Sequence, residues 1–297
     1  MARLPLSHAE TLAVVVEEGT MDAAARRLRI TPSAVSQRIS ALEAQLGQVL
    51  LVRGRPARAT SAGRSVVRWA REVALLEHDA MDELGVDGAS ATSVAIAVNA
   101  DSLATWLLPA LVELTTTHPV VVDLRRADED DTADLLAEGA VLAAVTTRRA
   151  PVSGCRSLPL GTMVYEAVAE RTFAERWFAG GAATRETLER APVVDFDRRD
   201  DLQTRWLEEH GADPARPPRH YVPASVEFAR AITSGMGWGL LPRSQSGDAL
   251  ADGRLVALGG APARVPLYWQ HWNLRSPLVD ALTARVRAAA SVALDSP

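Results

Sequence analysis

Two groups of side chains in this sequence are suited to binding DNA. The first follows a Thr-Pro pair, carries hydroxyl and amide groups at helical spacing, and is not interrupted by an acidic residue. Such groups can donate and accept hydrogen bonds at base edges in the major groove. Its members are Thr31, Ser33, Ser36, Gln37, Arg38 and Ser40. The second is a turn that carries the cations Arg53, Arg55 and Arg58, which is typical of contacts to phosphate or to the minor groove.

A third group of polar and aromatic residues could bind a small molecule. Its members follow predicted strands or begin predicted helices, where open α/β sheets bind ligands. Free backbone N–H groups at Ser102 and Ser225 could hold a carboxylate, and the acids could hold an ammonium or guanidinium group. The candidates are Asn99, Asp101, Ser102, Leu103, Trp106, Asp130, Thr132, Thr146, Asp195, Phe196, Asp197, Ser225, Glu227 and Trp269.

Ordinary structural roles remain open for several of these candidates. Asp101 and Ser102 are common residue types at helix N-caps. The acidic run at residues 128–131 is more often a solvated loop than a cation site. Trp106 and Trp269 are equally suited to a protein core or to the wall of a cavity.

Residue patterns of the common enzyme classes are missing from the sequence. It has no GxSxG, Walker A or HExxH pattern, and no GxGxxG after a predicted strand. No two of its six histidines have metal-ligand spacing, and Cys155 is the only cysteine, which excludes a disulfide framework and a cysteine zinc site. We expect a protein that is not an enzyme and that has neither a metal nor a cofactor.

The elements that must position the first two groups form a predicted winged helix-turn-helix over residues 1–60. Ser7 has capping-box spacing before a first helix that ends at Gly19, and Thr20 can cap a second helix. Thr31 and Pro32 suit the N-cap and first position of a third helix, which ends at Gly47. The apolar side of that helix is formed by Val35, Ile39, Leu42 and Leu46, and residues 49–52 and 59–60 are predicted as the strands of a wing.

A long helix is predicted from Thr60 or Ser61 to about Leu84, within a linker at residues 61–90 that closes with a hinge at 87–90. Its apolar residues keep an approximately heptad spacing, which favours pairing with the same helix of a second chain. Packing against its own effector domain is the alternative. The residues predicted to pair are Val66, Trp69, Ala70, Val73 and Leu76.

Residues 91–297 alternate short strands with helices, which is typical of an α/β domain with parallel strands. Lobe 1 is predicted at about 91–163 and 265–297, and lobe 2 at about 164–264. The predicted strands are 93–98, 120–124, 142–146, 164–169, 193–196, 220–222, 238–242 and 267–272. The predicted helices are 103–117, 131–138, 202–209, 226–234 and 277–290.

Charge and hydropathy agree with a DNA-binding head on an acidic body. The 297 residues carry a net charge of -5, yet residues 1–64 hold nine arginines against five acids. The N-terminus lacks a secretory pattern, and no apolar run is long enough for a membrane span. We expect a cytoplasmic protein that has no membrane partner.

The N-terminal motifs resemble LysR-type transcriptional regulators. The resemblance is carried by Met21–Leu28, Thr31–Ile39, Leu42-Glu43, Leu46-Gly47 and Thr60–Gly63. It implies an α+β multidomain protein: a winged helix-turn-helix, a long linker helix and a two-lobed effector domain similar to periplasmic binding proteins. It also implies a homodimer or tetramer, a double-stranded DNA operator and contact with RNA polymerase.

The effector domain is similar to the branch of that family that controls export of basic amino acids, the ArgP/LysG branch. Val98–Leu111, Ala191–Asp197 with Asp200-Asp201, and Leu267–Trp269 carry this similarity. It implies lysine or arginine as effector, although the acid at Asp131 departs from the branch pattern. The alternatives are a LysR-type regulator of another metabolite, a stand-alone small-molecule binding protein, and a replication-initiation inhibitor. A periplasmic binding protein would not explain the basic N-terminal head.

Overall fold

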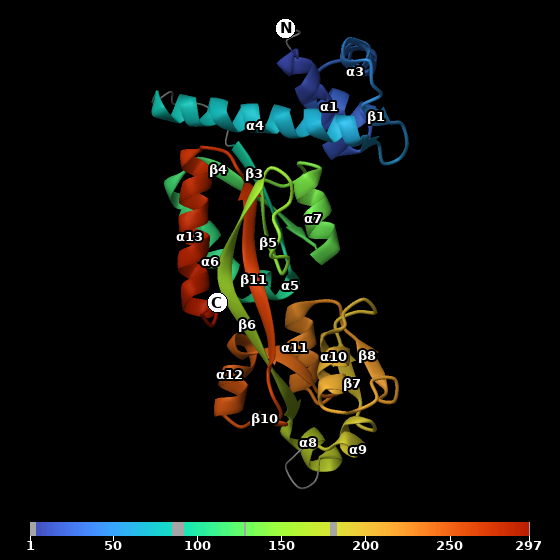
Figure 1. Ribbon diagram of the computed structural model, residues 1–297, viewed down its shortest axis with the longest axis vertical. Helices are drawn as coiled ribbons and strands as arrows, with labels where there is room; N and C mark the ends of the chain where they lie inside the picture. The colour runs from blue at the N-terminus through green and yellow to red at the C-terminus, as the bar shows by residue number, and fades with distance from the viewer. Residues whose placement is uncertain (1–3, 85–91, 128, 179–182, 297) are drawn as a thin grey trace. The chain divides into compact units, whose positions relative to one another are not determined.

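The computed structural model describes residues 4–84, 92–127, 129–178 and 183–296, excluding the side chains of Asp82, Glu129 and Asp130 (Figure 1). The chain divides into two compact units. Unit 1 comprises Met1–Val98, Leu111–Leu158 and Trp269–Arg285, and unit 2 comprises Asn99–Ala110, Pro159–Tyr268 and Val286–Pro297. Residues 99–110 therefore belong to unit 2, whereas the predicted lobe 1 included them. The predicted hinge at 87–90 lies outside the described residues.

The N-terminal part of unit 1 begins with the predicted helices and wing. The helices start where capping was expected, since Thr20 Oγ1 accepts from the Ala23 N–H at 3.2 Å and Thr31 Oγ1 accepts from the Ala34 N–H at 3.1 Å. The elements are α1 (Leu6–Glu18), α2 (Met21–Leu28), α3 (Pro32–Leu46), β1 (Leu51–Val52), β2 (Arg58–Ala59) and α4 (Ser61–Glu83).

Two details of the N-terminal prediction are wrong. Helix α1 begins after Pro5, so Ser7 lies inside its first turn instead of capping it. Leu46 is 37% exposed because it is the last residue of α3, next to the left-handed Gly47. The rest of the apolar stripe, Val35, Ile39 and Leu42, is buried in one core with α1 and α2. This packing leaves the opposite side of α3 to solvent.

Helix α4 contributes to the same N-terminal core. Thr60 Oγ1 accepts from the Gly63 N–H at 3.0 Å, which caps the helix. Val66, Val67 and Ala70 are buried in the core, and α4 packs along α1. Val66 and Ala70, two of the five residues predicted to pair chains, are therefore covered by their own chain. Val73 is half-buried and Leu76 is 44% exposed.

The remainder of unit 1 is built on strands that are neighbours in the order β11-β5-β3-β4, and the pairs formed by β3 with β4 and with β5 are parallel. Strand β3 pairs in parallel with β4 from Thr92↔Val120 to Val98↔Arg126, and with β5 at Ile96↔Ala143. Figure 1 shows α7 on one side of these strands and α6 with α13 on the other. The elements are β3 (Thr92–Val98), α6 (Leu108–Thr117), β4 (Val120–Arg126), α7 (Glu129–Ala137), β5 (Ala143–Thr146), β11 (Ala263–Trp272) and α13 (Pro277–Ala293).

Unit 2 departs from the predicted parallel pattern. Strand β6 pairs antiparallel with β9 and with β10, whereas β7 and β8 are parallel. Strand β6 is also longer than predicted, and α8, α9, α12 and β10 were not predicted at all. The elements are α5 (Ala100–Ser102), η1 (Leu103–Leu107), β6 (Cys155–Glu170), α8 (Arg171–Trp177), α9 (Arg185–Leu188), β7 (Val193–Asp195), α10 (Leu202–Glu209), β8 (Arg219–Tyr221), α11 (Ser225–Thr233), β9 (Gly239–Pro242), α12 (Arg243–Ala251) and β10 (Leu255–Ala257).

The helix predicted at 103–117 is split into the π-helical turn η1 and α6, and the short helix α5 precedes it. Pro109 is the second residue of α6, and a wider π turn before it avoids the clash and the missing donor of a proline inside an α-helix. The core of unit 2 contains Trp206 and Trp238, with ring centroids 5.4 Å apart, beside the apolar cluster around Ile232. This core holds the ends of β7 and α11 in place.

Candidate DNA-binding surface and effector site

The polar side of α3 is exposed as predicted from its spacing. Ser33, Gln37 and Ser40 are exposed, and Ser36 is half-buried between the solvent side and the core side. Thr31 caps the helix, and its hydroxyl also lies 2.9 Å from that of Ser33. These groups form the candidate recognition surface of α3.

Arg38 takes a different position from the other members of its group. Its guanidinium donates to Thr11 Oγ1 of α1 at 3.2 Å, and the side chain is half-buried. This contact joins α3 to α1. Arg38 therefore has a structural partner inside the domain, whereas the exposed Gln37 amide has no hydrogen-bond partner among the described residues.

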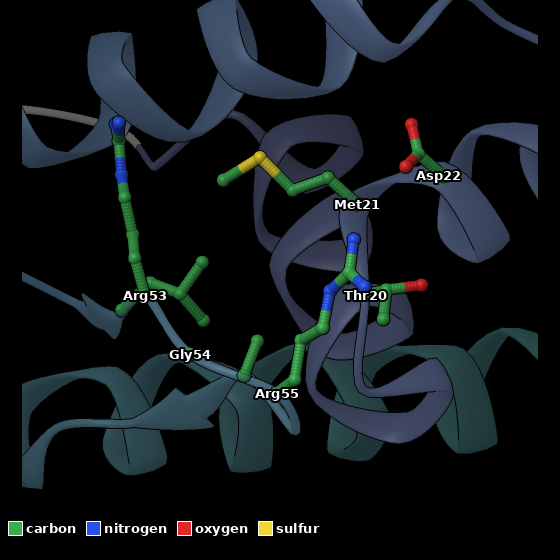
Figure 2. A pocket seen from close by; sticks show the side chains of 8 residues that line it. Thr20, Met21, Asp22, Arg53, Gly54 and Arg55 are labelled. Carbon is green, nitrogen blue, oxygen red and sulfur yellow. The ribbon is translucent and has the colours of Figure 1, made fainter.

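The wing is a short antiparallel ribbon that carries the three predicted cations. Leu51 pairs with Ala59 and Val52 with Arg58, and Arg53, Arg55 and Arg58 are all exposed. A cavity of about 190 Å³ lies between the wing turn and the first turn of α2. In the view of Figure 2, the side chains of Arg53 and Arg55 extend from the wing on either side of Met21. Cations at a helix N-terminus suit a phosphate group.

In unit 2, the structure brings four polar side chains into one hydrogen-bonded chain. Tyr165 Oη donates to Asp101 Oδ2 at 2.8 Å, and Ser225 Oγ donates to Asp101 Oδ1 at 2.7 Å. Gln245 Nε2 donates to Ser225 Oγ at 2.9 Å. Both oxygens of the Asp101 carboxylate are thus oriented by hydroxyl groups, and no described ion pair neutralises it.

Two further acids, Asp195 and Asp200, belong to the same region, and Asp200 is influenced by the charges of both Asp101 and Asp195. Asp195 is 1% exposed, and its Oδ2 accepts from Arg219 while its Oδ1 has no partner. Burial raises the pKa of Asp195, and Arg219 offsets part of that increase. Burial also raises the pKa of Asp200 to about 6, and the negative charges of Asp195 and Asp101 add to the effect. Within the described ranges no cation pairs with Asp200, so the Asp101, Asp195 and Asp200 carboxylates form an acidic cluster.

Hydrogen-bond acceptors are also in excess around this cluster. Asn99 precedes α5, and its Oδ1 is buried with no hydrogen-bond partner among the described residues. The same holds for Gln245 Oε1 and Asp195 Oδ1. Buried polar atoms are normally paired. A ligand that brings several N–H groups and a positive charge would satisfy these acceptors, as a guanidinium or ammonium group does.

Other predicted effector residues of unit 2 have local roles. Phe196 packs on Phe228 at 6.4 Å between ring centroids. Asp197 Oδ1 accepts from the backbone N–H groups of Arg199 and Asp200, which holds the turn that carries Asp200. Leu103 and the buried Trp106 lie in η1, and Glu227 is exposed in the first turn of α11.

The remaining predicted effector residues belong to unit 1 and do not join the network. Trp269 is fully buried and its Nε1 donates to Thr283 Oγ1 at 3.1 Å, which gives it a partner within the protein interior; its role at a ligand surface stays a prediction. Thr132 and Thr146 are buried, and Thr146 Oγ1 accepts from the Arg148 N–H. The side chain of Asp130 lies outside the described residues.

Neither Tyr165 nor Gln245 was predicted from the sequence as a site residue. Asp200 was named only with Asp201, among the residues that carry the similarity to the ArgP/LysG branch. Tyr165 lies in the middle of β6, away from any strand end. Gln245 lies in the first turn of the unpredicted helix α12, three positions after β9 ends at Pro242, so its place after a strand end was an available signal. Asp200 follows β7 by five positions, and the Asp-rich turn at 195–201 was the one available signal.

Other chemistries find little support in the described chain. Among those residues, no group of three or more His, Cys, Asp or Glu could hold a metal ion. No helix within the described ranges is long and apolar enough to cross a lipid bilayer. Cys155 is free and half-buried, and burial raises the pKa of its thiol, which disfavours the reactive thiolate.

Known protein families match both the N-terminal and the C-terminal part of the chain. The family "Bacterial regulatory helix-turn-helix protein, lysR family" matches residues 6–64, and "LysR substrate binding domain" matches residues 87–291. The first match covers α1 to the start of α4, and the second covers all the strands of the two-unit effector region.

Individual relatives match almost over their full length. The chain is 46% identical to the HTH-type transcriptional regulator LysG of Mycobacterium tuberculosis over 94% of this chain and 91% of that one. It is 41% identical to the lysine export transcriptional regulatory protein LysG of Corynebacterium efficiens, over 97% and 98%. The structure of full-length LysG from Corynebacterium glutamicum with bound effector Arg matches with a TM-score of 0.80 at 37% identity, over 98% and 99%. The chain therefore belongs to the LysR family of bacterial regulatory helix-turn-helix proteins.

Proposed function

We propose that this protein is a transcriptional regulator that binds an operator through α3 and the wing and senses lysine or arginine in unit 2. The observation that carries the effector assignment is the acidic cluster, where Asp101 and Asp200 have no cationic partner among the described residues. The related C. glutamicum protein is described with bound Arg, which supports the same class of ligand. By analogy with the C. efficiens relative, the regulated gene encodes a basic amino-acid exporter.

The two acids have different roles in this proposal. Asp101 is oriented by Tyr165 and Ser225, so its carboxylate can accept from an ammonium group in a defined direction. Asp200 carries a single backbone hydrogen bond, from the Leu202 N–H at 3.0 Å, and its other oxygen remains for a second positive group. A basic amino acid offers two such groups, whereas leucine and glutamate offer one.

The backbone N–H at Ser225, predicted as a carboxylate site, does not take that role in this proposal, because the Ser225 hydroxyl brings the Asp101 carboxylate next to it. Asp101 already accepts from this hydroxyl, and two carboxylates at one hydroxyl would repel each other. The buried and unpaired Ser102 Oγ remains as a donor for the ligand carboxylate.

The rest of the proposal follows from the family architecture. The protein acts in the cytoplasm, where its operator is, as a homodimer or tetramer that contacts RNA polymerase. It performs no catalytic step and needs no metal or cofactor. The acidic charge of the body also keeps DNA contacts confined to the basic N-terminal head.

Calorimetric titration of the full chain with arginine, lysine, leucine and glutamate tests the effector assignment. We expect arginine and lysine to bind and the other two not to. Asp200→Asn should weaken binding of the basic amino acids about tenfold or more, because a charge-assisted hydrogen bond is lost. Asp201→Asn is the matched control, since Asp201 is 62% exposed and pairs with Arg205. Preferential binding of leucine or glutamate would refute the assignment and leave a LysR-family regulator of another metabolite.

A further inference from the structure

Among the contacts of helix α4 with the effector part of unit 1, one arginine has several partners. Arg68 Nη1 donates to the Ser153 carbonyl at 2.9 Å and Nη2 donates to the Gly154 carbonyl at 2.7 Å. Its Nε donates to Glu72 Oε1, one turn along α4, at 2.9 Å. The guanidinium also lies over the ring of Trp272, 5.5 Å from the centroid. We use "the Arg68 contact" for the bonds to Ser153 and Gly154 with the Trp272 stacking.

Two glycines make this close approach possible. Gly139 follows α7 with φ +67°, and a Cβ there would lie 2.9 Å from Arg68 Cβ and 3.0 Å from Arg68 Cα. Gly154 has φ +74°, and a Cβ there would lie 2.6 Å from Arg68 Nη2. Both positions therefore exclude a side chain for conformational and for steric reasons. The loops of the effector part are shaped to receive α4 at Arg68.

The other arginines on α4 make weaker or different contacts. Arg64 pairs with Glu138 at 3.7 Å, and both side chains are more than a third exposed. Arg71 donates to the Gly139 carbonyl and approaches Glu17 of α1 at 3.6 Å. A surface pair such as Arg64–Glu138 contributes little. The planar guanidinium of Arg68 donates to two carbonyl oxygens, and an ammonium group, which acts as a point charge, could not replace it.

The Arg68 contact lies at the ends of two particular strands. Gly154 immediately precedes β6, and its carbonyl also accepts from the Asn273 N–H, just after β11 ends at Trp272. Strands β6 and β11 each contribute residues to both units, and β6 carries Tyr165, which orients Asp101. Arg68 thus makes its contacts at the ends of β6 and β11 that belong to unit 1. The other ends of both strands belong to unit 2.

We propose that Arg68 couples the effector site to DNA binding, by joining the linker helix to the ends of β6 and β11. Effector binding that changes the position of β6 would change the Arg68 contact and, through α4, the position of the DNA-binding domain. Such coupling requires two states of the protein, and the effector and the DNA must each bind one of these states more tightly than the other. Arg68 is a positioning residue in this mechanism and touches neither DNA nor effector.

The experiment compares Arg68→Gln with the matched control Arg64→Gln in the full chain. Operator affinity is measured with and without arginine, and the ratio of the two values is the coupling factor. We expect Arg68→Gln to move that factor about fivefold or more toward one, with arginine still binding by calorimetry. Arg64→Gln should leave it within about twofold, because its pair is exposed. Gly154→Ala should reproduce the Arg68→Gln result by displacing the guanidinium.

Amide hydrogen exchange without effector gives a second readout that does not depend on the identity of the effector. Arg68→Gln should increase exchange in α4 and at Asn273, whose N–H bonds to Gly154, while Arg64→Gln should not. Unchanged exchange in Arg68→Gln, or increased exchange with an unchanged coupling factor, would overturn the proposal. The inference rests on the proposed effector class for its first readout only. A wild-type protein whose operator affinity ignores arginine and lysine would refute that class, and the exchange result would still decide whether Arg68 holds α4.

Discussion

The Tyr165 hydroxyl donates to Oδ2 of Asp101 at 2.8 Å, which joins the middle of β6 to the helical segment after β3. Burial, and then the Asp101 charge, raise the pKa of Tyr165 well above its usual range, so the phenol stays protonated and keeps donating. The Asp101 carboxylate is thereby held in one orientation before any ligand arrives. Fixed acceptors bind cations with less reorganisation than mobile ones.

Tyr165→Phe tests this orientation. Asp101 Oδ2 loses its donor, which we expect to lower the free energy of unfolding by about 1–3 kcal/mol and to weaken arginine binding. Denaturant unfolding and calorimetry measure the two effects. Tyr268→Phe is the control, since the Tyr268 hydroxyl has no hydrogen-bond partner within the described residues. Equal effects of the two substitutions would show that the Asp101 contact has no special role.

Effector affinity should rise between pH 5 and pH 7. The folded-state pKa of Asp200 is about 6, above the value of about 3.9 for an unperturbed Asp. Its contribution to stability is therefore fully present below about pH 3.9 and is lost as the pH rises through 6. A cationic ligand requires the ionised form, so binding releases a proton near pH 6 and is weaker at pH 5. Calorimetry from pH 5 to pH 7.5 measures this dependence.

The pH dependence near pH 6 should follow the ionisation of Asp200, whose pKa is about 6. Asp200→Asn is expected to flatten the affinity profile over this interval, whereas Asp201→Asn, at an exposed position, should keep it. A profile that persists in Asp200→Asn would assign the titrating group elsewhere.

DNA specificity and DNA affinity should separate on α3 and the wing. Gln37→Ala should change which half-site sequences bind, because an exposed amide can form two hydrogen bonds to adenine. Arg55→Ala should weaken binding to all sequences alike and lower the salt slope by about one. Competition binding against mutated half-sites distinguishes them, and equal losses on every sequence in Gln37→Ala would refute its assignment.

Introducing a charge into helix α4 should have different effects at Leu76 and at Val66. Leu76→Glu, at a 44% exposed residue, should dissociate the oligomer and leave the domain folded if α4 pairs two chains. Val66→Glu buries a charge in the N-terminal core and should cost several kcal/mol of stability. Sedimentation and thermal unfolding provide the measurements. An unchanged oligomer in Leu76→Glu would place the dimer interface outside this part of α4; Val73→Glu, the position favoured by the heptad spacing, provides a second test.

Local interactions explain what the sequence determined by itself. Thr20, Thr31 and Thr60 cap helices that follow them within three residues, and Gly47 ends α3, so these features depend only on neighbours in the chain. The polar side of α3 follows in the same way from its period of 3.6 residues.

The candidate effector site could be predicted from the sequence only in part. Asp101 and Ser225 follow strand ends, where a ligand is expected in an α/β fold, and the structure bonds them to each other. Tyr165 completes that network from a strand interior, a position that carries no local signal, and Gln245 completes it from the first turn of an unpredicted helix after β9. Trp269 was predicted inside the strand at 267–272, and only the tertiary structure shows that its side chain is fully buried.

The partners of α4 were decided by tertiary structure alone. An apolar stripe shows that Val66 and Ala70 must be covered, yet it contains no information on whether the same chain or a second one covers them. The Arg68 contact is a still clearer case, because its acceptors are backbone carbonyls that every residue possesses. Which carbonyl lies opposite a given guanidinium depends on segments 85 and 86 positions apart folding side by side, and no local pattern encodes that distance.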